Sequence, residues 1–332
     1  MEWYLPLIWS AIMAIAVVMY VLMDGFDLGI GLLFPFASER ERDQMMRSIA
    51  PFWDGNETWL VLGGAGLFVV FPGAYAVIMP ALYIPVIVML VSLVFRGVAF
   101  EFRTVSRSKI GWSIAFTLGS GLAAFAQGVI LGNLIQGFTI RDNAFAGGPL
   151  DWARPFPVLC GVAVMTGYAL LGATWLVMKT EGTVARRARA QAKVLLIAVL
   201  VFMAVVSIWT PLMEPRIADR WFTLPNIAFL WLVPAVTALT AFFAWRWLER
   251  GAEVLPFLAS LALFLFGYLG LVISNFPYIV PPTLTIWDTA AAAPSQIFML
   301  LGTLFLLPII IGYFVMVYWL FRGKVREGES YH

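Results

Sequence analysis

Long apolar runs that contain almost no charge recur along the whole sequence. A helix of about 20 apolar residues crosses the hydrocarbon core of a bilayer. Only 12% of the 332 residues are charged, about half the share that is usual in a soluble domain. The pattern predicts an all-α fold, a polytopic transmembrane helical bundle in which residues 1–332 form a single integral-membrane domain without a separate soluble domain. It excludes a nucleic-acid-binding protein, a disordered chain and an ordinary cytosolic enzyme.

We predict about nine transmembrane spans. The first is expected to be retained, because no positively charged segment and no clear cleavage site of a signal peptide mark the start of the sequence. The second is the shortest of the nine. The spans are expected at residues 6–36, 56–71, 74–103, 112–138, 156–178, 194–213, 222–247, 255–276 and 296–321.

The basic residues predict how the chain is oriented in the membrane. With the N-terminus outside, 17 of the 21 Lys and Arg residues fall at inner loops or in the C-terminal tail. Arg141, Arg154, Arg216 and Arg220 fall outside. Because Lys and Arg accumulate in cytoplasmic loops, we expect the N-terminus outside and, after an odd number of spans, the C-terminus in the cytoplasm.

The sequence has one histidine, His332, and one cysteine, Cys160. A single cysteine excludes an internal disulfide and a thiolate-held cluster. Membrane haem proteins usually hold iron with axial histidines. If the chain takes part in redox chemistry, we therefore expect the metal on a partner, and we assign no metal ligand here.

Asp24 and Asp27 lie well inside the first apolar run. Carboxylates are costly in hydrocarbon, so acidic residues at such positions indicate function by default. Their spacing places both on one helix face, where two acids in a low dielectric should not both ionise freely. We expect them to serve a proton relay. The alternative is that both accept hydrogen bonds from neighbouring helices and serve packing only.

Asp54 and Glu57 open the second predicted span on its inner side. One interpretation is a capping box, with Asp54 as the N-cap residue and Glu57 three residues later. The other is proton handling, and one residue can do both.

Arg96, Glu101 and Arg103 end the third predicted span. One interpretation is a cytoplasmic ion-pair cluster in which Arg96 and Arg103 snorkel to the membrane surface. The other adds Glu101 to the acids that lie where protons would enter from the cytoplasm.

The fourth predicted span carries small and amide side chains that favour helix contacts. Gly128 and Gly132 permit a close approach of helix backbones. Gln127, Asn133 and Gln136 are expected to form hydrogen bonds between helices.

At these residues the sequence resembles subunit II of the cytochrome bd quinol oxidases, and the cyanide-insensitive branch more than the enterobacterial type. The resemblance covers nearly the whole chain. The matching segments are Asp24–Gly29, Ile49–Leu60, Phe95–Arg103 and Asn275 through Asp288.

The resemblance implies an enzyme of the bacterial cytoplasmic (inner) membrane that oxidises quinol, reduces O2 to water and takes protons from the cytoplasm. It implies two b-type haems and one d-type haem on subunit I, which the nine-span subunit II stabilises without supplying haem ligands. Some members also contain a small single-span subunit, and some hold a structural quinone in subunit II.

The resemblance also bears on the site. It implies that the acid at Asp54 lies on a proton route and that Asp24 and Asp27 lie nearby. The sequence departs from the enterobacterial pattern at Phe52, where a histidine is common, and at Glu57, where a glutamine is common. Because of these departures, the proton route need not have the same members as in the enterobacterial type. The candidates for the route are Asp24, Asp27, Asp54, Glu57 and Glu101.

Two other functions fit part of the sequence. A proton-coupled secondary transporter would also have many spans and buried acids, but the inverted repeats and paired broken helices of transporters are not evident. A purely structural scaffold for subunit I would differ only in whether the acids matter for activity.

Overall fold

A computed structural model describes residues 3–325. Apart from loops and two short hairpins, this part of the chain is helical. The helices are α1 (Tyr4–Leu33), the short 3-10 helix η1 (Phe34–Phe36), α2 (Glu39–Ile49), α3 (Trp53–Val70), α4 (Pro72–Val105), α5 (Ile110–Gln136), α6 (Pro155–Lys179), α7 (Gly182–Met213), α8 (Pro215–Phe222), α9 (Ile227–Leu230), α10 (Leu232–Glu249), α11 (Leu255–Asn275) and α12 (Ala293–Leu320). The strands form two short antiparallel hairpins, β1 (Ile140–Arg141) with β2 (Ala144–Phe145) and β3 (Tyr278–Val280) with β4 (Leu284–Thr285). The predicted all-α class is confirmed.

Eight helices within residues 3–325 are long and apolar enough to cross a membrane. They are α1, α4, α5, α6, α7, α10 with α9, α11 and α12. The second predicted span, residues 56–71, corresponds to α3, which has 18 residues. Asp54, Asn56 and Glu57 in its first turns lower its hydropathy, so the count of nine stays a prediction.

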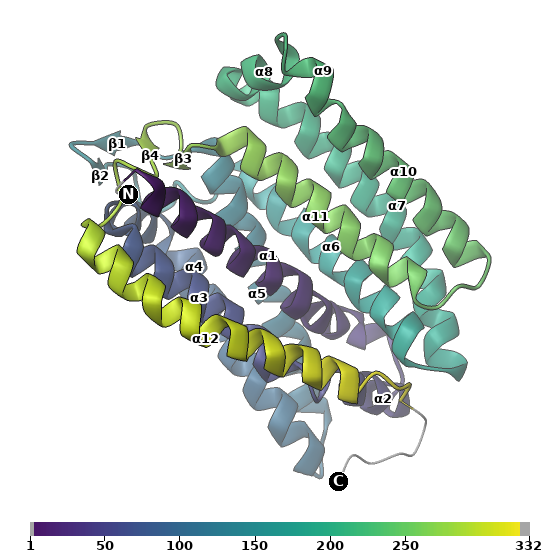
Figure 1. Ribbon diagram of the computed structural model, residues 1–332. Coiled ribbons are helices and arrows are strands. Elements are labelled where there is room, and N and C mark those ends of the chain that lie inside the picture. The colour runs from purple at the N-terminus through teal and green to yellow at the C-terminus, as the bar shows by residue number, and fades with distance from the viewer. Residues whose placement is uncertain (1–2, 326–332) are drawn as a thin grey trace.

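The bundle is built around α1, α5 and α6 (Figure 1). On one side α3, α4 and α12 lie against this centre, and on the other side α7 and α11 do, with α10 packed on the outside of α7 and α11. Among the eight candidate spans α6 is the most buried and α12 the least. The outer face of α12 is lined by large exposed apolar side chains.

Glycines allow the central helices to touch. A Cβ atom added to Gly29 of α1 would lie 1.8 Å from the carbonyl oxygen of Tyr168 in α6. A Cβ atom on Gly128 of α5 would lie 2.3 Å from the carbonyl oxygen of Cys160, also in α6, and one on Gly132 would lie 2.5 Å from Pro157 Cα. The predicted close approach at Gly128 and Gly132 is therefore confirmed, with α6 as the partner helix.

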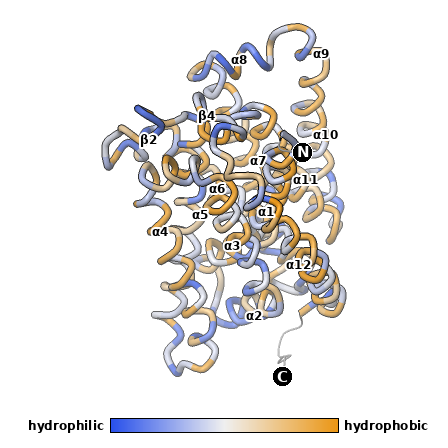
Figure 2. Tube along the Cα trace, turned by 60° about the vertical axis from the view of Figure 1, so that its left-hand side comes forward, coloured by the Kyte–Doolittle hydropathy of each residue, from blue (hydrophilic) through white to orange (hydrophobic). Residues whose placement is uncertain are grey.

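Polar segments gather at the two ends of the bundle (Figure 2). One end carries α2, the turn between α4 and α5, and the C-terminal end of α12. The opposite end carries the two hairpins and α8, and it includes Arg141, Arg154, Arg216 and Arg220. The basic residues predicted to lie inside and outside are thus separated to opposite ends of the molecule, while its orientation in the membrane stays a prediction.

Candidate functional site

Helix α1 presents Asp24 and Asp27 to the interior of the bundle, and both residues are fully buried. They lie nearly one helical turn apart and so share a face. Gly25 leaves room for the ring of Tyr168, whose Cε1 would lie 2.8 Å from a Cβ atom at that position. The close contact between α1 and α6 therefore places these two acids away from lipid.

Arg96 of α4 gathers three carboxylates around its guanidinium. Its Nη2 atom lies 2.7 Å from Asp24 Oδ1 and 3.9 Å from Asp27 Oδ2, and its Nη1 atom lies 2.6 Å from Glu57 Oε1. The ring of Trp53 lies 5.2 Å from the guanidinium carbon, within the range of a cation–π contact. Asp24, Asp27, Glu57 and Arg96 are called the Arg96 cluster below.

The Arg96 cluster includes more acids than it has positive charge to balance them. Three carboxylates meet one guanidinium, which is itself fully buried. An uncompensated buried charge costs several kcal/mol, and a buried acid escapes that cost by binding a proton. The arrangement therefore favours binding of a proton by at least one of these carboxylates.

The acids in and next to the Arg96 cluster differ in how exposed their side chains are. The Glu57 side chain is 27% exposed, whereas those of Asp24 and Asp27 are 0% exposed. Asp54 lies in the turn before Glu57 and is exposed. Among the described residues Asp54 forms no ion pair. The four acids thus run from the surface of α3 to the buried face of α1.

The predicted capping box at the start of α3 is wrong. The helix begins at Trp53 with Phe52 as its N-cap residue, and no side chain caps it. The reason is that the turn after α2 already brings Phe52 into a helical conformation, so Asp54 falls inside the first turn. Glu57 then points to Arg96 and not back to the N-cap amide.

The structure adds two polar residues that sequence reasoning missed. Asn56 donates a hydrogen bond from Nδ2 to Asp27 Oδ2 (2.7 Å), and the hydroxyl of Tyr318 in α12 donates to Asn56 Oδ1 (2.9 Å). Asn56 could have been found, since it is an amide between two candidate acids. Tyr318 gave no such signal, because tyrosines are common near the ends of membrane helices.

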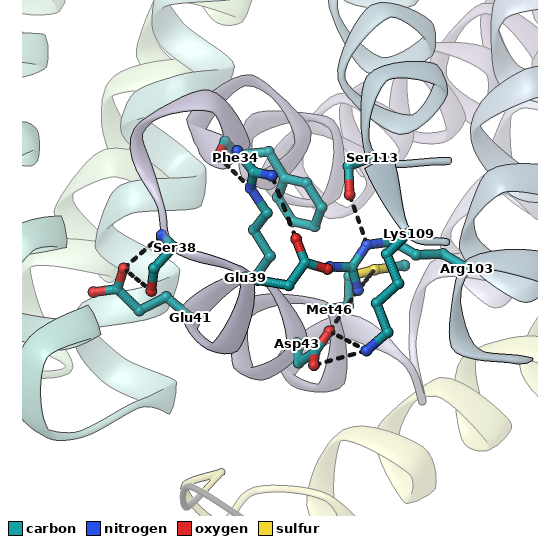
Figure 3. Close-up of polar contacts among 10 residues, drawn as sticks. Phe34, Ser38, Glu39, Glu41, Asp43, Met46, Arg103, Lys109 and Ser113 are labelled. Carbon is teal, nitrogen blue, oxygen red and sulfur yellow. Dashed lines mark hydrogen bonds and ion pairs between the residues drawn. The ribbon is translucent and has the colours of Figure 1, made fainter. Parts of the chain in front are cut away.

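Arg103 forms a second cluster with α2 (Figure 3). Its guanidinium pairs with Glu39 (2.6 Å) and Asp43 (2.6 Å), and its Nε donates to Ser113 Oγ (2.9 Å). Lys109 also pairs with Asp43 (2.9 Å). Partial burial alone would raise the pKa of Asp43, but the hydrogen bonds from Lys109 and Arg103 hold that pKa below its ordinary value.

The predicted snorkelling of both arginines is therefore wrong. Arg96 and Arg103 are 0% and 1% exposed. Their side chains turn into the bundle because carboxylates on α1, α2 and α3 offer partners there. The predicted ion pairing of Arg96 and Arg103 itself is present, in two separate clusters. Glu101, in contrast, is exposed and joins neither of them within the described part of the chain.

The amides of the fourth predicted span differ in their partners. Gln127 of α5 donates to the hydroxyl of Tyr20 in α1 (2.8 Å) and accepts from that of Tyr168 in α6 (2.6 Å), as predicted. Asn133 bonds to the carbonyl oxygen of Trp152 in a loop. Gln136 leaves its buried Oε1 atom without a partner among residues 3–325.

The described part of the chain, residues 3–325, contains no histidine. The one histidine of the sequence, His332, lies outside the described residues. Within residues 3–325 no group of three or more His, Cys, Asp or Glu side chains is placed to hold a metal ion. No haem-dependent step is therefore assigned to residues of this chain.

Comparison with known proteins gives one consistent result. The sequence model of the family described as cytochrome bd terminal oxidase subunit II matches residues 5–321. Cytochrome bd-I ubiquinol oxidase subunit 2 of Escherichia coli (strain K12) is 29% identical and aligns with 98% of this chain and 96% of its own. Cytochrome bd ubiquinol oxidase subunit 2 of Bacillus subtilis (strain 168) is also 29% identical, with 97% of both chains aligned.

A solved structure has the same fold. It is a chain of the bd oxidase from Geobacillus thermodenitrificans, which superposes with a TM-score of 0.78 at 19% identity. The superposition covers 96% of this chain and 98% of that one.

Proposed function

The chain belongs to the cytochrome bd terminal oxidase subunit II family, and we propose that its Arg96 cluster carries cytoplasmic protons toward the site of oxygen reduction. As subunit II it is part of a quinol:O2 oxidoreductase of the bacterial cytoplasmic membrane. The match over residues 5–321 does not favour a proton-coupled transporter.

The chemistry of the complex is divided between its subunits in this proposal. Subunit I holds two b-type haems and one d-type haem, which supply electron transfer and oxygen chemistry. This chain supports subunit I and supplies titratable side chains. A small single-span subunit, a structural quinone and the cyanide-insensitive branch stay predictions of the resemblance.

One observation carries the proposal: three carboxylates share one buried guanidinium. A scaffold that needed only an ion pair would be satisfied by Arg96 and Asp24 alone. The additional acids are costly in a bundle interior unless they bind protons. Their protonation and deprotonation is the property that a relay requires.

The graded exposure of the acids gives the relay a direction. Asp54 is exposed at the start of α3, and Glu57 follows it and is partly exposed. Asp27 and Asp24 are fully buried behind Arg96. We place proton entry at Asp54 and Glu57, and the onward step at the α1 carboxylates. Glu101 has no place in this order.

The test replaces the acids with amides that keep their shape but cannot carry a proton. We expect Asp54→Asn, and at least one of Asp24→Asn and Asp27→Asn, to slow oxygen uptake per mole of haem by tenfold or more, which is about 1.4 kcal/mol of barrier. Haem content and subunit association should stay near the parental level. Asp→Glu at the same position should recover part of the rate.

Glu249→Gln is the matched control, because Glu249 is an exposed acid whose ion pair with Arg246 lies outside both clusters. It should run at the parental rate. A scaffold role predicts the opposite pattern, with poor assembly and normal turnover of whatever complex forms. If all three Asn variants assemble fully and match the parent, this chain supplies no proton route.

A further inference from the structure

Asn56 connects the buried acid Asp27 with the last helix of the bundle. Its amide nitrogen donates to Asp27 Oδ2 (2.7 Å) and to the carbonyl oxygen of Met23 (3.3 Å). The Met23 carbonyl can only accept a hydrogen bond, and an ionised Asp27 can likewise only accept one. Together they therefore favour the amide orientation in which the NH2 group of Asn56 points toward α1. The hydroxyl of Tyr318 then donates to the remaining atom, Oδ1, at 2.9 Å.

The end of α12 that carries Tyr318 is anchored by hydrogen bonds, although most of the helix is exposed on the surface of the bundle. Lys179, at the end of α6, donates to the carbonyl oxygens of Phe321 and Gly323, the latter at 2.8 Å. Val325 connects the chain after α12 to α6 and α2. Its amide donates to the carbonyl oxygen of Lys179 (2.8 Å), and its carbonyl oxygen accepts from Gln44 (2.9 Å). The hydrogen bonds made just after α12 thus hold the end of the helix, and with it the side chain of Tyr318, in place.

The surroundings of Asp27 leave one of its oxygens free. Asp24 of α1, Glu57 and Asn56 of α3, Arg96 of α4 and Tyr318 of α12 are the titratable or polar groups around it. From α5 and α6, Gln127 and Tyr168 lie beside α1 at the level of Tyr20 and Gly25. Oδ2 is occupied by Asn56, whereas Oδ1 is buried and has no hydrogen-bond partner within residues 3–325.

We propose that Tyr318 and Asn56 are positioning residues that fix Asp27 Oδ2 as a hydrogen-bond acceptor and leave Oδ1 as the atom that takes up the proton. The inference rests on the proposed function of the Arg96 cluster. An N–H donor to a carboxylate stabilises its ionised form, so this chain of bonds limits how tightly Asp27 holds a proton. The anchored end of α12 thereby sets the working pH range of the relay.

Tyr318→Phe tests this in the complete purified complex, because it removes only the hydroxyl that donates to Asn56 Oδ1. Asn56 is then held only by its bonds to Asp27 and Met23, so it can rotate more readily and present Oδ1 to Asp27, which favours the protonated acid. Asp27 then keeps its proton to higher pH, and the alkaline limb of oxygen uptake per mole of haem should move upward by about half a pH unit or more. Asn56→Leu, which removes the donor, should move it in the same direction and further.

Tyr313→Phe is the control, since Tyr313 lies on the same helix with 54% exposure, and its pH profile should match the parent. A measurement without turnover is the infrared difference spectrum on reduction, in which Tyr318→Phe should shift a protonated carboxyl band that Asp27→Asn abolishes. If Tyr318→Phe leaves both the profile and the band at their parental positions, the inference is wrong.

Asp27→Asn in the same series separates the two proposals. If Asp27→Asn slows turnover and Tyr318→Phe leaves the profile unchanged, the positioning role fails and the relay stands. If Asp27→Asn and the other amide variants run at the parental rate, the relay fails and the positioning role fails with it.

Discussion

Arg96 holds the acids of two helices together through the shape of its side chain. Its two terminal nitrogens address different partners, Nη1 contacting Glu57 of α3 and Nη2 contacting Asp24 of α1. A planar guanidinium offers several donors in a fixed fork, whereas a lysine ammonium is a compact point charge. The fork thus allows one buried cation to keep three carboxylates within reach without pairing fully with all of them.

At the scale of a residue, His332 provides a test of where the haems are held. It is the only histidine of the sequence. Since we expect subunit I to supply the haem ligands, His332→Ala should leave the visible haem spectrum and the oxidase activity of the complex unchanged. Loss of one haem signal from a fully assembled complex would show that this chain supplies an axial ligand.

At the scale of an element, the contact between α1 and α6 fixes where the buried acids lie. Gly29 and Gly172 face each other across it, and a Cβ atom at Gly172 would lie 2.6 Å from the carbonyl carbon of Gly29. Lipid provides no hydrophobic drive for such contacts, so close packing of small residues must stabilise them. Any widening here would also move Asp24 and Asp27.

Gly29→Ala should therefore destabilise the protein. Its new methyl group would meet the Tyr168 carbonyl at 1.8 Å, and a helix backbone cannot yield as a flexible side chain can. Overpacking of this kind costs about 1–3 kcal/mol or more, which should appear as a lower melting temperature and a lower yield of complex. Gly312→Ala is the control, since among residues 3–325 no atom beyond its chain neighbours and its own helix backbone lies within 4 Å of a Cβ there. Equal stability of the two variants would contradict the close contact.

At the scale of the whole molecule, the two polar ends differ in composition and architecture. The end with α2 contains the Arg103 cluster and most basic loops, whereas the opposite end contains the two hairpins and α8. The Arg96 cluster lies closer to the basic end, because Asp54 and Glu57 begin α3 directly after α2. A cytoplasmic basic end would place proton entry on the cytoplasmic side.

Cysteine labelling in intact cells tests that orientation. Ala144→Cys in β2 should react with an impermeant thiol reagent added from outside, and Thr183→Cys at the start of α7 should react only after the membrane is opened. Both positions are exposed, and the native Cys160 is 3% exposed, so it contributes little background. The reverse pattern would reject the orientation and move the proposed proton entry to the outside.

The sequence alone determined the membrane location, the helical class and most helix positions. These follow from local hydropathy, since a helix satisfies its own backbone hydrogen bonds and needs no distant partner to be stable in lipid. The weakest prediction was the span at α3, because acids and an amide in its first turns obscure the apolar pattern. The candidate acids were also visible, since a carboxylate is conspicuous in an apolar run.

Only the tertiary structure decided which of these residues work together. Arg96 turns inward to Asp24 and not outward to the membrane surface, and Tyr318 reaches Asn56 across 262 positions of sequence. Glu101 and Glu57 look alike as acids near the ends of helices, yet one is exposed and the other pairs with Arg96. The reason is that hydropathy fixes each helix along its length but leaves its rotation and neighbours open. Those are set by close backbone contacts and by hydrogen bonds between helices, which no local pattern in the sequence encodes.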